Sequence, residues 1–410
     1  MEQKRLSVFA NIIWNSIGSF TYLACQWLLT LIVVREFNDF GYAGNFALAI
    51  SVTNIFYNFA CFNVRPYLVS DLNEKYSSKQ YCTFRLYTCI CAFVLCLCYA
   101  MTWKYGMQQI MCIVAYMVYK ETEAWTDLLH AFEQRQERMD IGGISLFIRG
   151  ILSLICFYVG IRITNDLFWA IVFMTCTVIV FIICYDYPRA KKIADISIDN
   201  DIYIMRKMLS DFLPLTIGTI LGVIGTTLPK QILQDIYGSS ILGIYNTVAT
   251  PAVLVQVVAS YIFNPMLVEF ARLYREKNKQ KLIKNILMVC IVLIVLIAIC
   301  FVGAKALGKA ALTFLYGNKV AEYSSILLLL ILFTGLNAFV WFFWNILILM
   351  RKQKQLLYIN LFGVIIGYLI MTPLISKYEM NGVSYVLTVY SIILIVMMIN
   401  AMIRELKTIV

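Results

Sequence analysis

The sequence predicts an all-α integral membrane protein with about 12 transmembrane helices in two six-helix lobes. Hydrophobic residues make up 61% of the 410 residues and charged residues only 14%, with a mean hydropathy of +0.78, and soluble globular domains do not have this composition. The apolar residues are gathered into about twelve segments of roughly 18 to 27 residues, each long enough to cross about 30 Å of hydrocarbon as a helix. The bilayer is therefore the main solvent of this chain.

The N-terminal lobe is expected to comprise residues 1–187 and the C-terminal lobe residues 211–410. Between them lies the polar stretch 188–210, with "PRAKKIADISIDND" at its centre, which is long enough for a linker but not for a domain. The expected spans are Val8 to Val34, Tyr42 to Val64, Leu86 to Trp103, Gln108 to Leu129, Ile141 to Ile161, Leu167 to Tyr187, Phe212 to Leu233, Ile241 to Phe270, Leu282 to Val302, Ser324 to Met350, Leu356 to Leu374 and Gly382 to Ile403.

The basic residues predict the orientation. Of the 34 Lys and Arg residues, 24 lie in the two terminal tails and in every second gap between the spans. By the positive-inside rule both termini then face the cytoplasm, and residues 188–210 form a cytoplasmic linker. The net charge of +11 is thus a sign of topology, and we expect no nucleic-acid partner.

Two short stretches recur between the halves. "FGYAGNFALAISV" at 40–52 is similar to "LGIYNTVATPAVL" at 242–254, and "RPYLVSDL" at 65–72 is similar to "NPMLVEFARL" at 264–273. The offset of about six helices preserves the topology. The pattern therefore predicts two lobes related by a pseudo-two-fold axis along the membrane normal, as in transporters built from parallel repeats.

These segments also carry a family resemblance. "VVREFNDFGYAGNFALAISV", "HAFEQRQERMDIGGISLFIRGILSLICF", "LPKQILQDIYGSSILGIYNTVATP" and "YIFNPMLVEFARLYRE" resemble the polysaccharide transporter family, the Wzx-type flippases of the MATE-like MOP superfamily. The resemblance implies a MATE-like transporter in the bacterial cytoplasmic (inner) membrane. Its substrate would be an undecaprenyl-diphosphate-linked oligosaccharide, moved to the outer leaflet for capsule, exopolysaccharide or O-antigen assembly, with membrane lipids and other polysaccharide assembly proteins as partners.

Four cations are candidates to bind the phosphates of such a substrate. Lys120 and Arg149 fall inside the fourth and fifth spans, where a charge costs about 2.5–3.5 kcal/mol unless it faces a cavity or a partner. Arg35 and Lys230 lie toward the outer ends of the first and seventh spans. For each residue the alternative is a structural role: internal pairing for Lys120 and Arg149, and snorkelling beside Glu36 and Asp39 for Arg35.

The fourth span carries Lys120, Glu123, Asp127 and His130 at steps that place them on one helix face. Glu123 and Asp127 are candidates for a polar path, and a buried ladder of ion pairs is the equal alternative. His130 is expected to be an interfacial residue.

Proline and glycine gather in the seventh and eighth spans. Pro229 and Pro251, with Gly222 and Gly225, are candidates for a gating hinge because proline removes a backbone hydrogen bond and bends helices. Close packing of small residues is the milder interpretation.

Two other functions remain possible on the sequence. A cation-coupled drug or metabolite antiporter would need a buried carboxylate, yet no acidic residue lies between Asn11 and Val34, and Asp127 is the best candidate elsewhere. A polysaccharide polymerase or glycosyltransferase would need a sizeable external loop, which is lacking, so we expect no enzyme. No phosphate-binding loop is visible and the cysteine cluster at 89–98 lacks a neighbouring His or carboxylate, so no cofactor or metal is expected.

Overall fold

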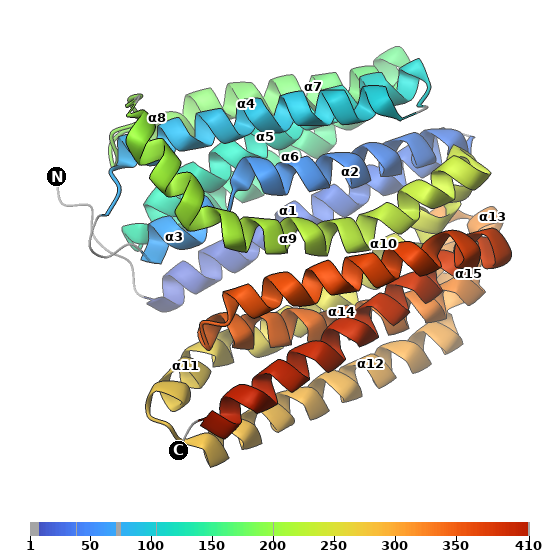
Figure 1. Ribbon diagram of the computed structural model, residues 1–410. Coiled ribbons are helices and arrows are strands. Elements are labelled where there is room, and N and C mark those ends of the chain that lie inside the picture. The colour runs from blue at the N-terminus through green and yellow to red at the C-terminus, as the bar shows by residue number, and fades with distance from the viewer. Residues whose placement is uncertain (1–7, 38, 71–74, 104, 200, 409–410) are drawn as a thin grey trace. The chain divides into compact units, whose positions relative to one another are not determined.

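The computed structural model describes residues 8–37, 39–70, 75–103, 105–199 and 201–408. Within these ranges the chain forms helices and no strand. It divides into two compact units (Figure 1): unit 1 comprises Met1–Asn38 and Asn45–Thr216, and unit 2 comprises Asp39–Gly44 and Ile217–Val410. The boundary between the units falls inside a continuous helix, α9 (Ile202–Tyr237).

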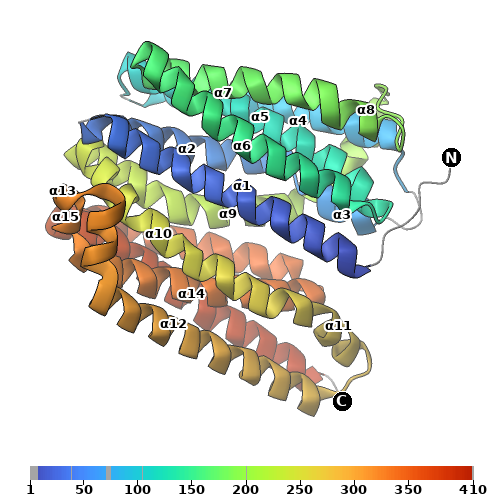
Figure 2. The same cartoon turned by 180° about the vertical axis from the view of Figure 1, so that it is seen from behind.

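Unit 1 is built around α5 and α6, which contact α7, while α1 packs along α6 (Figure 2). Short helices follow α2 and α7: a turn at Phe62 and Asn63, both with positive φ angles, leads from α2 into α3, whereas α7 continues directly into η1 and α8. The elements are α1 (Val8–Glu36), α2 (Phe40–Cys61), α3 (Val64–Ser70), α4 (Ser78–Thr102), α5 (Met107–Arg135), α6 (Met139–Thr164), α7 (Leu167–Phe181), the π-helix η1 (Ile182–Asp186), α8 (Tyr187–Ala190) and the beginning of α9.

Unit 2 is centred on α14, which contacts α10, α12 and α15. One residue of α15, Glu379, has non-helical angles (φ 50°, ψ −125°) and divides that element into two helical arms. The elements are the end of α9, α10 (Ser239–Phe263), the 3-10 turn η2 (Asn264–Met266), α11 (Leu267–Arg275), α12 (Lys279–Tyr316), α13 (Asn318–Ala321), α14 (Ser324–Leu349) and α15 (Gln353–Thr408).

The long apolar helices agree with the fold class that the sequence predicts. In the described part of the chain, ten helices are long and apolar enough to cross a bilayer. Helix α5, which has 29 residues and carries several charges, is not among these ten, and α15, which is, consists of two helical arms. The predicted all-helical membrane fold is confirmed.

Several helices do not end where the expected spans end, because helical geometry does not follow hydropathy alone. Helix α4 begins at Ser78 rather than Leu86, since Ser77 and Gln80 form a reciprocal capping box that starts the helix in polar sequence. Helix α12 runs to Tyr316, beyond the expected end at Val302. The expected eighth span instead stops at Phe263 and continues as η2 and α11.

Polar and aromatic contacts attach the beginning of α9 to the rest of unit 1. Asp211 forms an ion pair with Lys75 and accepts a hydrogen bond of 2.7 Å from the Tyr76 hydroxyl, while the Phe212 ring stacks on Tyr67 at 4.3 Å. Burial, with help from the Asp211 carboxylate, raises the pKa of Tyr76 to about 12. Residues 202–210, expected in the linker, are therefore an integral part of a helix.

Two glycines allow α1 and α6 to approach each other closely. A β-carbon on Gly18 would collide with the Gly143 carbonyl group, and one on Gly143 would collide with the Trp14 carbonyl oxygen. Small residues serve this purpose widely between membrane helices, because van der Waals contact drives their association.

Replacing Gly18 by leucine is expected to lower the free energy of unfolding by about 1–3 kcal/mol, since overpacking forces two helices apart. Denaturant titration in detergent micelles measures the change. The control is Gly303→Leu on α12, where nothing lies within 4 Å of the added β-carbon. Equal stability of the two variants would contradict the close packing of α1 against α6.

Candidate functional site

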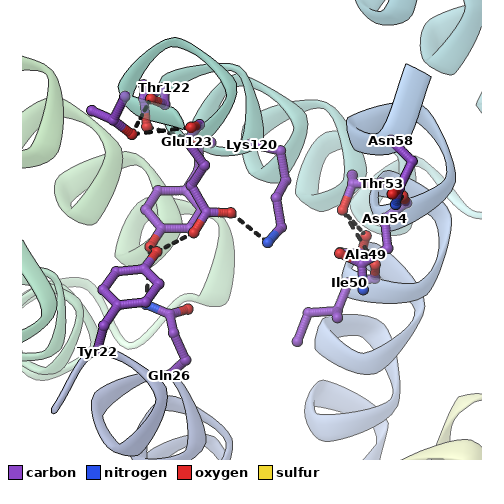
Figure 3. Close-up of polar contacts among 12 residues, drawn as sticks. Tyr22, Gln26, Ala49, Ile50, Thr53, Asn54, Asn58, Lys120, Thr122 and Glu123 are labelled. Carbon is purple, nitrogen blue, oxygen red and sulfur yellow. Dashed lines mark hydrogen bonds and ion pairs between the residues drawn. The ribbon is translucent and has the colours of Figure 1, made fainter. Parts of the chain in front are cut away.

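Lys120 lies inside unit 1 and is paired with Glu123, one turn later on α5. Its Nζ is 2.5 Å from the Glu123 carboxylate, and the two side chains are 14% and 9% exposed. The ammonium group also lies 5.1 Å from the centre of the Tyr57 ring and 5.6 Å from that of Tyr116. Figure 3 shows the contact between the Lys120 ammonium group and the Glu123 carboxylate. Lys120 is therefore paired internally, which the sequence analysis gave as its alternative role.

Residues of α1 complete the surroundings of Glu123. The Tyr22 hydroxyl donates a hydrogen bond to Glu123 (Figure 3) and lies 2.6 Å from the Tyr119 hydroxyl. Gln26 donates a bond of 2.9 Å to the same Tyr119 oxygen. Nothing in the sequence pointed to Tyr22, because a lone tyrosine in an apolar span is usual in membrane helices.

Arg149 approaches the same group from α6. Its residue is 3% exposed, its guanidinium donates a hydrogen bond to the Thr126 hydroxyl, and it lies 5.1 Å from the Tyr22 ring centre. No carboxylate forms an ion pair with Arg149 in the described part of the chain. We call Tyr22, Tyr119, Lys120, Glu123 and Arg149 the Lys120 cluster.

Asp127, the third member of the predicted polar stripe, is shared by two arginines. Its oxygens are 3.1 Å from Arg65 on α3 and 3.3 Å from Arg85 on α4. Arg85 is completely buried and also donates a 2.7 Å bond to the Ala60 carbonyl oxygen. Arg85 lies one residue before the expected span that begins at Leu86, so hydropathy did not place it inside the membrane helix. The serine-to-glutamine capping pattern at 77–80 was the signal that would have placed it inside a helix.

Arg35 and Lys230 are the two remaining cation candidates. Arg35 is in the last turn of α1, next to Glu36, which forms a 3.0 Å ion pair with Arg162. Lys230 belongs to unit 2, is half-buried on α9, and has no ion-pair partner among the described residues. Of the four cation candidates, the structure brings two together in unit 1, namely Lys120 and Arg149.

The hinge candidates lie within uninterrupted helices. Helix α9 runs through Pro229 and α10 runs through Pro251. A β-carbon on Gly222 would be 3.4 Å from the Asn360 amide oxygen, whereas one on Gly225 would overlap the ring of Tyr390. Gly225 thus allows close packing within unit 2, and a hinge role for these residues stays a prediction.

Polar residues of α2 are satisfied by their own helix. Thr53 donates to the Ala49 carbonyl at 2.7 Å, and Asn58 donates to the Asn54 carbonyl at 2.7 Å (Figure 3). Bonds of this kind remove the cost of a polar group in an apolar helix. These donors are consequently engaged, while the side-chain oxygen of Asn58 can still accept a hydrogen bond.

The charges of the Lys120 cluster do not cancel. Lys120 and Arg149 are two cations, and Glu123 is the one carboxylate among the five residues. Such an arrangement attracts an anion, and charge-assisted hydrogen bonds to phosphate are about twice as strong as neutral ones. The described residues contain no group of three or more His, Cys, Asp or Glu arranged to hold a metal ion.

Known proteins match this chain in sequence and in fold. The family model described as "Polysaccharide biosynthesis protein" matches residues 8–271. "Capsular polysaccharide biosynthesis protein CapF" of Staphylococcus aureus is 25% identical over 375 residues, which cover 89% of this chain and 91% of that protein.

Two solved structures share the fold at low sequence identity. An inward-facing MATE family multidrug resistance transporter of the MOP superfamily aligns with a TM-score of 0.72 and 12% identity, covering 97% of this chain and 98% of the other. The lipid II flippase MurJ in an inward closed conformation aligns with a TM-score of 0.74 and 11% identity, covering 97% and 90%. Family and fold together support a transporter rather than an enzyme. Because the family model covers well over half of its length, this chain belongs to the polysaccharide biosynthesis protein family.

Proposed function

We propose that this protein is a flippase that moves undecaprenyl-diphosphate-linked oligosaccharide repeat units from the cytoplasmic to the outer leaflet by alternating access. The observation that carries the proposal is the excess of positive charge in the Lys120 cluster, inside a membrane-embedded unit. A diphosphate loses its hydration on entering such an interior, and fixed cations compensate for that loss. The family membership and the MurJ-like fold support the same class of substrate.

The transport cycle follows from the chemistry of the substrate. The cations hold the diphosphate, the glycan occupies the hydrated interior, the polyprenyl chain stays in lipid, and the N-terminal and C-terminal lobes rock between inward and outward states. Outward movement of about two negative charges is favoured by about 2.3 kcal/mol per charge for each 100 mV of membrane potential. The potential is therefore sufficient to bias the direction of transport.

The setting of this function is the bacterial inner membrane, with both termini in the cytoplasm, as the distribution of basic residues favours. Membrane lipids surround the protein, and other polysaccharide assembly proteins supply its substrate and use its product. The name of the staphylococcal relative favours capsule over O-antigen as the product of the pathway.

A cation-coupled antiporter is less well supported, and the position of Asp127 is the reason. The coupling carboxylate of an antiporter must be able to exchange its cation. Asp127 instead contacts two arginines, one of which is completely buried, so two fixed charges already neutralise it.

The proposed function is tested by mass spectrometry of lipid extracts from a strain that lacks the protein. We expect the complete undecaprenyl-diphosphate oligosaccharide to accumulate while the surface polymer disappears. The wild-type gene restores the normal pool, whereas Lys120→Ala and Arg149→Ala at equal abundance do not, because each removes a phosphate-binding cation. Lys309→Ala, a change of an exposed lysine on α12, is the matched control and restores the pool.

The alternatives give different results in this experiment. An unchanged lipid pool with altered drug sensitivity would support the antiporter. A repeat unit that reaches the outer face but stays unpolymerised would support a polymerase.

A further inference from the structure

Three titratable side chains at one end of unit 1 have no part in the proposed phosphate site. His130 and Glu133 lie one turn apart near the end of α5, and Asp186 is the last residue of the π-helix η1. Glu133 and Asp186 are 0% exposed and His130 is 6% exposed. Such complete burial of two carboxylates is unusual and requires a partner for their charge.

His130 and Glu133 lie beside Gly142 of α6, and Asp186 lies beside His130. His130 Nε2 lies 3.5 Å from an Asp186 oxygen. A β-carbon on Gly142 would lie 3.2 Å from His130 Cγ and 3.3 Å from Glu133 Oε2, so the absence of a side chain at Gly142 makes room for both. Among the described residues, no hydrogen-bond partner is present for either oxygen of Glu133, either oxygen of Asp186, or Nε2 of His130.

Three arginines of unit 1 make contacts outside this group. Arg65 is bound to Gln134 and Asp127, and Arg149 is bound to Thr126. Arg189 on α8 stacks 3.6 Å from the Tyr185 ring centre and donates to the Tyr185 carbonyl. Two further charged residues, Arg138 and Asp140, pair with each other through hydrogen bonds of 2.9 and 3.0 Å.

We propose that Glu133, Asp186 and His130 form a proton-binding site, in which Glu133 carries the proton at neutral pH and His130 faces the Asp186 carboxylate. Two adjacent carboxylates in a dry interior cannot both stay charged without a cation, so one of them takes up a proton from water and becomes a neutral acid. We assign the proton to Glu133 because both of its oxygens lack a hydrogen-bond partner. Asp186, by contrast, has His130 3.5 Å away.

A proton is the ligand that this geometry favours over a metal ion. A metal cation needs several converging ligands, and the described residues contain no cluster arranged to provide them.

The π-helix η1 places Asp186 in this group. It widens one turn of the continuous helix from α7 to α8, and π-helical turns are often found at functional sites.

The site also suggests regulation, and this step rests on the proposed flippase function. Loss of the proton leaves two negative charges side by side, which favours separation of α5 from η1 and entry of water. Protonation therefore keeps this end of unit 1 closed, and flipping by the wild type depends on pH. In Glu133→Gln, which permanently mimics the neutral acid, this pH dependence is lost.

The binding of a proton is tested by infrared difference spectroscopy on the full chain in nanodiscs, titrated from neutral to alkaline pH. We expect the wild type to show the carbonyl stretch of a buried carboxylic acid at neutral pH, with a shift in D₂O and loss at alkaline pH. Glu133→Gln lacks this band. Glu322→Gln, a change of an exposed residue in unit 2, retains it, and in Asp186→Asn the band is lost at a lower pH because the neighbouring negative charge is gone.

Thermal unfolding provides a second measurement. Glu133→Gln should match the wild type at acidic pH, where glutamate is protonated in both the folded and the unfolded chain. Its stability should increasingly exceed that of the wild type from there through neutral to alkaline pH, because the folded wild type holds a proton that unfolding releases. The proposal is overturned if wild type and Glu133→Gln have identical spectra, or if sodium chloride removes the band at constant pH, which would indicate a metal cation. A failed flipping assay with a positive spectrum would contradict the flippase function and leave the proton site established.

Discussion

Replacing Asp127 by alanine is expected to lower the free energy of unfolding by about 3–5 kcal/mol, the usual cost of removing one partner of a buried ion pair. The cost arises mainly at Arg85, whose guanidinium is completely buried and would keep the Ala60 carbonyl as an acceptor but no negative charge. Arg65 suffers less, because its side chain is 33% exposed and it retains Gln134. Denaturant titration in detergent micelles measures the change.

Two further variants show whether this cost comes from an uncompensated charge. Arg85→Met combined with Asp127→Ala should recover much of the lost stability, because the double change removes the buried cation along with its partner. Glu269→Ala breaks an exposed pair with Arg272 at 2.7 Å, and such pairs contribute about 1 kcal/mol or less. If Asp127→Ala costs no more than Glu269→Ala, the interior of unit 1 is hydrated around Arg85.

Lys120→Ala is expected to lower the rate of flipping about 10- to 100-fold. Loss of one charge-assisted hydrogen bond to phosphate removes about 1.5–3 kcal/mol of binding, and each 1.4 kcal/mol corresponds to a factor of ten. The assay uses proteoliposomes that contain an undecaprenyl-diphosphate-linked oligosaccharide, and it follows the arrival of the glycan at the outer leaflet with a membrane-impermeant glycosidase. Lys120→Arg keeps the charge and should retain transport.

The double variant Lys120→Ala with Glu123→Gln separates substrate binding from internal pairing. If Lys120 serves only to neutralise Glu123, removal of both charges restores transport to the rate of Glu123→Gln alone. We expect the double variant to stay as slow as Lys120→Ala, because the phosphate has still lost its cation. Equal abundance and equal thermal stability of the variants are the controls, and restored transport would assign Lys120 a purely structural role.

Much of the fold could be predicted from the sequence because the bilayer imposes it. Every backbone polar group that crosses hydrocarbon must be bonded within its own helix, so the number and length of apolar segments determine the crossings. The same constraint made Lys120 and Arg149 conspicuous, since a charge in an apolar run needs a cavity or a partner. Helix ends were less predictable, because α4 and α12 continue into polar sequence where capping and packing, rather than hydropathy, decide where they stop.

The sequence by itself determined the class of the protein, its helical segments and two of the cations in its interior. Only the tertiary structure decided the partners of those charges: Glu123 for Lys120, Thr126 for Arg149, and Arg65 with Arg85 for Asp127. Hydropathy records how many charges a segment carries, but pairing depends on distances between residues far apart in the chain. The buried group of His130, Glu133 and Asp186 was missed for this reason. His130 and Glu133 stand near the end of α5, Asp186 stands some fifty residues later at the end of η1, and the three become a site only when α5, α6 and η1 pack together.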